Sequence, residues 1–100
     1  MVIIATSTQE EAEEIGKTLV EERLAASANI IPSIKSFFFW KGAFNNISES
    51  ILLLNTRSDL FAKIRERVRE LHSYELPEVI ALPIIAGSSD FLAWIKENTQ

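Results

Sequence analysis

The sequence predicts a single α+β domain, in which strands and helices follow the order β-α-β-β-α-β with a further helix at the end. Three observations predict this class. Runs of β-branched and apolar residues alternate with segments whose apolar residues recur at helical spacing. The chain has 100 residues, the length of one domain, so residues 1–100 are expected to form one unit. Hydrophobic residues make up 47% and charged residues 24%, which favours a packed core over a disordered chain.

The first part of the chain predicts a strand, a helix and a longer strand. Val2–Thr6 is short, apolar and β-branched, which favours a strand. Thr8 stands three residues before Glu11, the spacing of a capping box at the start of a helix. The apolar residues of this helix recur at helical intervals and are Ala12, Ile15, Leu19, Val20 and Leu24. Asn29–Trp40 returns to a strand pattern, in which Pro32 indicates a bulge or an edge position.

The second part predicts a turn, two more strands and two helices. Lys41–Ala43 is typical of a turn, and Ile47–Asn55 follows as a strand. Thr56 or Ser58 is expected to cap the next helix. The apolar stripe of that helix consists of Leu60, Phe61, Ile64, Val68 and Leu71. Val79–Ile85 predicts the fourth strand. The short closing helix contains Phe91, Leu92, Trp94 and Ile95.

This order is the split βαβ arrangement called ferredoxin-like, a βαββαβ sandwich with an antiparallel sheet and both main helices on one face. The other face is expected to be open, yet several strand segments are apolar at consecutive positions. These segments are Phe37–Trp40, Ile51–Leu54 and Val79–Leu82. Burying one such side chain is worth about 1.5–3 kcal/mol. We therefore expect a second copy of the chain to cover the open face.

The chain is acidic and lacks cysteine. Lys and Arg number 10 against 14 Asp and Glu, which gives a net charge of −4. Nucleic acids and anionic membranes bind basic surfaces, so neither is expected as a partner. Without cysteine there is no disulfide and no thiolate ligand for zinc. No apolar run approaches the roughly 18 residues of a membrane span, and no basic residues precede the apolar N-terminal run, so we expect a soluble, cytoplasmic protein.

Motifs of nucleophilic catalysis are absent from the sequence. It has no Cys–His pair, no Gly-x-Ser-x-Gly elbow and no glycine-rich phosphate loop. We therefore expect a protein that is not an enzyme, with a hydrolase as a distant alternative. The aromatic run Phe37–Trp40 is expected to pack in the core and in interfaces rather than to stack on bases, because the chain is acidic.

Several segments together carry a resemblance to a known family. They are Leu19–Ala26, Asn29–Pro32, Trp40–Gly42, Leu53–Thr56, Leu71–Glu78, Ala81–Pro83 and Phe91–Ile95. In company they resemble the CutA family of divalent-cation tolerance proteins, and the resemblance runs nearly end to end. It implies a homotrimer of ferredoxin-like subunits, built like PII signalling proteins, with long hairpins that pack across subunits. It also implies a role in the response to metal ions.

The chain departs from the family pattern at positions that matter for metal binding. Family members often have cysteine where this chain has Ala5 and Ser27, and some have a second histidine where it has Leu71. After the Trp-x-Gly motif, Ala43–Asn45 replaces the usual basic, apolar and acidic residues. Soft ligands for copper are thus mostly absent. The resemblance therefore implies the fold and the assembly more strongly than it implies metal chemistry.

His72 is the only histidine. As a metal ligand it suits copper, zinc or nickel, with Glu75 three residues later as a second ligand. A closed transition-metal site usually has about four ligands, so binding of Cu(II) or another divalent cation is expected to be weak, and no cofactor is required. The alternative is a structural role at the end of the second helix, where a donating side chain satisfies the last carbonyl groups.

A second candidate site lies around the loop before the fourth strand. Trp40, Glu49, Tyr74 and Glu78 resemble the polar and aromatic set that lines a cleft between CutA subunits. Aromatic walls with a few polar groups are typical of small-ligand pockets, which would make the protein a PII-like sensor or scaffold. The alternative is that these groups form hydrogen bonds that lock the trimer. Both interpretations stay open at this point.

Overall fold

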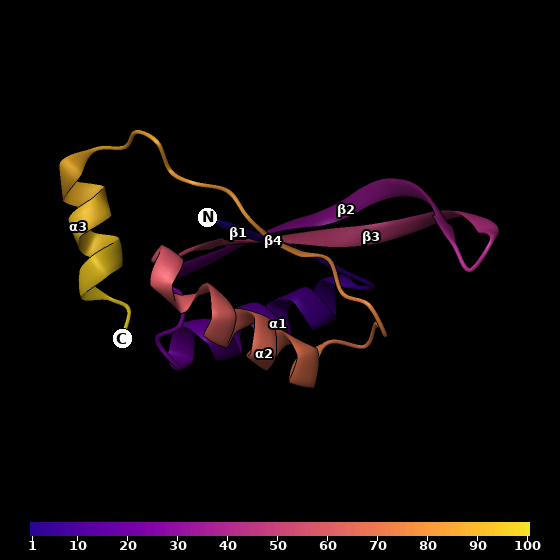
Figure 1. Ribbon diagram of the computed structural model, residues 1–100, viewed down its shortest axis with the longest axis horizontal. Helices are drawn as coiled ribbons and strands as arrows, with labels where there is room; N and C mark the ends of the chain where they lie inside the picture. The colour runs from indigo at the N-terminus through magenta and orange to yellow at the C-terminus, as the bar shows by residue number, and fades with distance from the viewer.

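A four-stranded antiparallel sheet in the order β2-β3-β1-β4 is the frame of the computed structural model, which describes residues 1–100. The elements are β1 (Val2–Thr6), α1 (Gln9–Glu21), β2 (Ser27–Trp40), β3 (Ala43–Asn55), the 3-10 turn η1 (Ser58–Leu60), α2 (Phe61–Leu71), β4 (Val79–Ala81) and α3 (Ser89–Glu97). Figure 1 shows α1 and α2 together on one face of the sheet, and α3 apart from them. The predicted ferredoxin-like α+β fold with an extra C-terminal helix is confirmed. None of the helices is both long enough and apolar enough to span a membrane.

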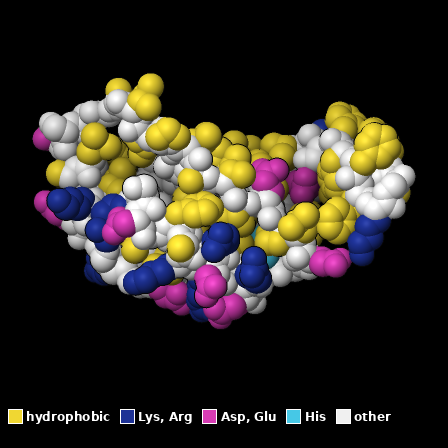
Figure 2. Space-filling model, in the orientation of Figure 1, with side chains coloured by type: hydrophobic (Ala, Val, Ile, Leu, Met, Phe, Trp, Pro, Cys, Tyr) yellow, Lys and Arg dark blue, Asp and Glu magenta, His cyan; other side chains and the backbone are white.

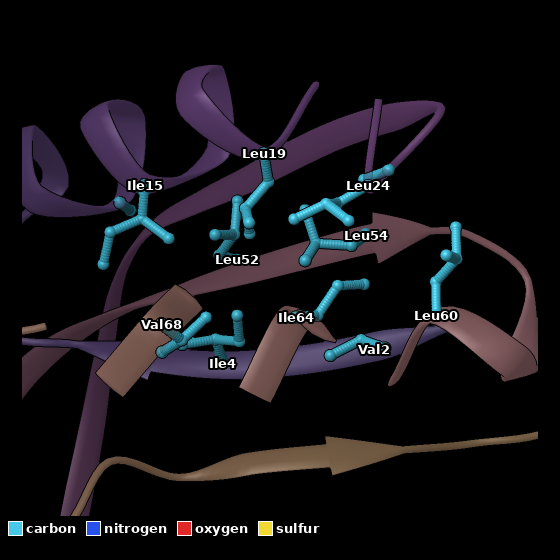
Figure 3. Packing of buried hydrophobic residues seen from close by; sticks show 12 residues of the cluster. Val2, Ile4, Ile15, Leu19, Leu24, Leu52, Leu54, Leu60, Ile64 and Val68 are labelled. Atoms are coloured by element: carbon cyan, nitrogen blue, oxygen red, sulfur yellow. The ribbon is translucent and has the colours of Figure 1, made fainter. Parts of the chain in front are cut away.

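The hydrophobic core lies between the sheet and the helices α1 and α2. In the register of β1 and β3, Val2 is opposite Leu54 and Ile4 is opposite Leu52. Because side chains alternate along a strand, all four point to the same face, and all four are buried. Figure 3 shows them meeting side chains from the two helices, among them Ile15, Leu19, Ile64 and Val68. The predicted helical stripes therefore face the core.

The start of α1 follows the sequence prediction in part, and the start of α2 does not. The capping box at α1 is half formed, because Glu11 Oε1 lies beside His72 and accepts no hydrogen bond from Thr8. The backbone N–H of Glu11 donates to Thr8 Oγ1 at 3.1 Å, so Thr8 caps α1 as predicted.

At α2 neither predicted cap forms. The Thr56 hydroxyl is buried and donates to the Leu24 carbonyl at 2.6 Å, and Ser58 begins the 3-10 turn η1. A buried hydroxyl needs a partner, and the Leu24 carbonyl provides it.

β2 and β3 form one long hairpin that reaches past the rest of the sheet. The register slips between Ile31 and Ile34, around Pro32, and β2 is an edge strand, so both predictions for Pro32 are confirmed. At the turn, Lys41 and Gly42 have φ angles of 50° and 79°, as a tight two-residue hairpin turn requires. This tight turn lets the ladder continue to its tip, so β3 begins at Ala43 and not at the predicted Ile47.

β4 is shorter than predicted, at three residues instead of the segment 79–85. Its partner β1 begins at Val2, and Leu82 N–H already donates to the Met1 carbonyl at 2.7 Å. Pro83 has no N–H with which to continue the ladder. Residues 83–87 are exposed and form no backbone hydrogen bond within the chain. They run as the orange connection from β4 to α3 in Figure 1.

The end of the hairpin, residues 34–49, projects from the body and is called the arm below. β1 pairs with β3 only as far as Thr6 and Ser50, so the arm consists of two strands alone. Its aromatic side chains are exposed, and Phe39 at 74% is the most exposed of them. Figure 2 shows a concave upper edge between the arm and α3, with hydrophobic side chains along it. The face that lacks helices is therefore apolar, as the sequence predicts.

Candidate functional site

The candidate site lies at the base of the arm, where the segment 72–78 between α2 and β4 runs alongside β3. The Tyr74 hydroxyl donates to Glu49 Oε2 at 2.8 Å. Closer to the tip, Lys41 Nζ lies 3.2 Å from Glu75 Oε2. Both contacts join this segment to the arm, beyond the point where β1 stops pairing with β3. Side chains, and not a backbone ladder, therefore join this segment to this part of the hairpin.

His72 fixes the start of this segment. The residue ends α2, and its side chain is fully buried, at 0% exposure. Nε2 lies 2.6 Å from the Ala5 carbonyl oxygen, and Nδ1 lies 3.0 Å from the backbone N of Tyr74. A carbonyl oxygen can only accept a hydrogen bond, so Nε2 carries the hydrogen and Nδ1 accepts from the Tyr74 N–H. One imidazole thus connects the end of α2, strand β1 and the residue that contacts Glu49.

Glu11 reaches the same cluster from the first turn of α1. Its Oε1 lies 3.3 Å from His72 Nδ1, and it is buried without a hydrogen-bond partner. Burial raises the pKa of Tyr74, and the hydrogen bond and charge of Glu49 and the charge of Glu11 raise it further. The Tyr74 hydroxyl therefore remains a hydrogen-bond donor to Glu49 well into the alkaline range.

The structure does not assemble the predicted metal-ligand pair of His72 and Glu75. Both imidazole nitrogens already have partners inside the chain, and Glu75 is exposed beside Lys41. Nowhere in the chain do three or more histidine or acidic side chains gather in a way that could hold a metal ion. His72 has a structural role, but its side chain bonds the Ala5 carbonyl in β1 and not the last carbonyls of α2.

The four residues predicted to line a cleft do come together. Two adjoining hollows share Phe38, Trp40 and Leu76 as walls. The first, of about 390 Å³, is also lined by Ala5, Ser36, Phe37, Glu49 and Glu78. The second, of about 200 Å³, is also lined by Asn45, Ile47, Tyr74 and Glu75. Acidic side chains lie among hydrophobic ones near the base of the arm in Figure 2.

Several participants are not among the site residues predicted from the sequence, and three of them matter most. Phe38 and Leu76 form walls of both hollows, and Glu11 faces His72. The alternation of Phe38 with Trp40 places them on the same face of the strand, which is a signal for Phe38. No such signal exists for Glu11, because its contact with His72 joins segments that are distant in the sequence.

Comparison with known proteins identifies the family. The family model described as CutA1 divalent ion tolerance protein matches residues 1–98. This chain belongs to the CutA1 family. The divalent-cation tolerance protein CutA of Thermus thermophilus is 44% identical over 99 residues, which are 99% of this chain and 96% of that protein. The protein of the same name from Archaeoglobus fulgidus is 43% identical over 99% of this chain and 96% of its own length.

Solved CutA1 structures have the same fold. The structure of the Thermus thermophilus protein superposes with a TM-score of 0.95 and covers 99% of this chain and 96% of its own. The Archaeoglobus fulgidus structure, described as a periplasmic divalent cation tolerance protein, also has a TM-score of 0.95, at 42% identity over 99% of this chain and 96% of its own. The family resemblance read from the sequence is thereby confirmed.

The contact between Tyr74 and Glu49 predicts an unusual titration. Tyr74 is the only tyrosine, so the phenolate absorbance reports on it alone. We expect its midpoint well above the ordinary value of about 10, and closer to that value in Glu49→Gln. Because the pKa is raised in the folded state, the stabilisation is fully present below about pH 10 and is lost as the pH rises through the folded pKa. A midpoint at the ordinary value in the native protein would contradict the contact.

Proposed function

We propose that this protein serves divalent-cation tolerance as a homotrimer without catalytic activity. The observation that carries the proposal is the match to the CutA1 family over residues 1–98, together with relatives that are named for divalent-cation tolerance. The proposal divides into an assembly, the absence of catalysis and a relation to metal ions. The names of relatives support the relation to metal ions, and contacts and exposed surfaces of the molecule support the other two parts.

The surface supports the assembly. Large apolar side chains are exposed on the arm, on the segment after β4 and on α3, with Phe39 and Ile85 at 74% and 93% exposure. A chain that stays single seldom exposes so much apolar surface in one region. Backbone groups point to the same conclusion, since residues 83–87 have no internal hydrogen bond and the outer edge of β2 has no neighbouring strand. Pairing between copies satisfies both sets of groups.

The chemistry of the buried groups supports the absence of catalysis. The only histidine has both nitrogens bonded within the fold, so neither is available as a general base. The chain has no cysteine to act as a nucleophile. The relatives that match over almost the whole chain are named for tolerance to divalent cations and not for a reaction.

Metal binding by a single chain is expected to be weak, because Tyr74 N–H and the Ala5 carbonyl already occupy both nitrogens of His72.

We also assign the protein to the cytoplasm in this proposal. The Archaeoglobus fulgidus relative is described as periplasmic and the Arabidopsis thaliana relative as chloroplastic, so the compartment differs within the family. Cell fractionation of the native organism is the check on location.

A second candidate function is that of a sensor that binds a small ligand at the base of the arm. One observation favours it specifically. The hollow there is lined by Trp40 and by Glu49, a carboxylate that is 7% exposed. Aromatic walls with few, well-placed polar groups are what small-molecule sites need. In the proposed trimer the exposed arm packs against other copies, so the ligand would bind in a cleft between subunits.

The assembly predicts a mass that light scattering can measure. Three chains of 11.3 kDa give 33.9 kDa. Trp40→Ala is expected to weaken the assembly, because it removes a large apolar side chain from the exposed arm. Arg65→Ala, at an exposed position of α2, is the matched control and should leave the mass unchanged. A native protein that stays at 11.3 kDa at all concentrations would contradict the proposal.

The occupied histidine predicts the outcome of a copper titration. In calorimetry, Cu(II) is expected to bind no more tightly than about 1 µM, and equally in His72→Gln. Glutamine keeps a donor and an acceptor at this position, so the fold should persist. Much tighter binding that disappears in His72→Gln would show that the histidine leaves its partners and becomes a metal ligand.

A further inference from the structure

We propose that Glu11 and His72 form a proton switch that sets how firmly the segment 72–78 holds the arm. This inference goes beyond the proposed function, because the contacts concerned lie inside one chain and depend neither on assembly nor on metal ions. It follows from one buried oxygen atom without a partner, from the geometry of the imidazole ring and from the contacts of Tyr74.

The oxygen without a partner is Glu11 Oε1. It is the one buried side-chain oxygen or nitrogen atom that has no hydrogen-bond partner in the chain. It lies 3.3 Å from His72 Nδ1, and the histidine side chain is 0% exposed whereas that of Glu11 is 16% exposed. A buried carboxylate oxygen without a donor is unfavourable. His72 Nδ1 becomes the missing donor as soon as it carries a proton, and the partly exposed carboxylate gives that proton a route from solvent.

The geometry of the imidazole ring makes the two neighbours of Nδ1 mutually exclusive partners. Each ring nitrogen has one position in the plane of the ring, which holds either a lone pair or a hydrogen. In the neutral ring the lone pair of Nδ1 accepts Tyr74 N–H at 3.0 Å, and Nε2–H donates to the Ala5 carbonyl at 2.6 Å. In the protonated ring Nδ1–H no longer accepts from Tyr74 and donates to Glu11 Oε1 instead. The Nε2–H contact is the same in both states.

Tyr74 transmits this change to the arm. Its backbone N–H is held by His72 Nδ1, and its hydroxyl donates to Glu49 Oε2 at 2.8 Å. The imidazole and phenol rings also pack together, with centroids 4.8 Å apart. Loss of the N–H contact therefore frees the residue that joins the segment 72–78 to the base of the arm. Uptake of the proton loosens the arm, and its release at higher pH fixes the arm again.

The titratable groups that contact the ring are Glu11 and Tyr74. Glu11 faces it from α1 and is the only carboxylate in ion-pair contact with it. Tyr74 faces it from its own segment, and β1 contributes only the Ala5 carbonyl. Glu49 of β3 lies one contact further away, beyond the Tyr74 hydroxyl. Histidine ordinarily changes its charge between about pH 5 and 8, whereas glutamate and tyrosine ordinarily titrate outside this range. A test in this range therefore isolates the histidine.

Nitrogen NMR of the imidazole and amide hydrogen exchange of Tyr74 test the switch on the native protein between about pH 8 and pH 5. His72 is the only histidine, so the signals of its ring nitrogens are unambiguous. We expect Nδ1 to carry no hydrogen at the alkaline end and to carry one at the acidic end. The protection of the Tyr74 amide, corrected for the intrinsic pH dependence of exchange, should fall about tenfold or more with the same midpoint.

Three variants separate the switch from general effects of pH. Glu11→Gln keeps the size of the side chain and removes its charge, so it should weaken proton binding about tenfold and move the midpoint about one pH unit lower. Glu14→Gln makes the same charge change at an exposed position of α1 and should leave the midpoint unchanged. His72→Gln keeps a donor and an acceptor but takes up no proton, so the protection of the Tyr74 amide should stay constant.

Two results on the native protein would overturn the proposal, whether or not every variant folds. One is a ring that stays neutral down to about pH 5. The other is a ring that takes up the proton while the Tyr74 amide stays protected. Equal shifts of the midpoint in Glu11→Gln and Glu14→Gln would also overturn it, as would the same pH-dependent loss of protection in His72→Gln.

Discussion

The unequal length of neighbouring strands is the constraint on which the rest of this structure depends. β2 and β3 pair from Ser27 to Trp40, whereas β1 accompanies β3 only between Ser50 and Leu54. A two-stranded ribbon alone is at best marginally stable in water. The arm is therefore stable only if other segments pack against it. Within the chain, the segment 72–78 lies along part of it, and in our account further copies cover the remainder.

The contacts of His72 explain how a short segment can support the arm. The ring donates to β1 and accepts from Tyr74 N–H, and the Tyr74 hydroxyl then donates to Glu49 on the arm. Sheet, helix end and arm are thus joined by three hydrogen bonds in series. Buried polar groups of this kind stabilise one arrangement only while all members are paired. Glu49 also lines the hollow at the base of the arm, so support of the arm and the candidate ligand site depend on the same residues.

Periodicity was sufficient to predict the elements, because it reflects which side chains face the core. The stripe of α1 and the alternation of β1 reappear as the buried cluster of the structure. Properties that depend on the neighbouring segment could not be predicted. The apolar run from Val79 looks like a long strand, but its pairing ends where β1 begins. Thr56 has the chemistry of a cap, yet the Leu24 carbonyl competes for its hydroxyl.

The candidate site could be predicted only in part, because some of its contacts join segments that are distant in the sequence. The aromatic and acidic residues of the cleft were found through the family resemblance, and the fold brings Trp40, Glu49 and Tyr74 together. The metal-ligand role of His72 was plausible from residue type and spacing alone. Only the packed structure shows that Ala5 and Tyr74 occupy its two nitrogens, since those partners come from two different segments of the chain.

The central claim is that other copies of the chain cover the arm and the segment after β4, which are exposed in one chain. Amide hydrogen exchange at residues 84–87 tests this claim. These amides are exposed and have no acceptor within the chain, so in a single chain they must exchange quickly. Our account predicts that they are protected in the native protein and become unprotected when dilution or Trp40→Ala separates the copies. Rapid exchange of all four in the native protein would contradict the account.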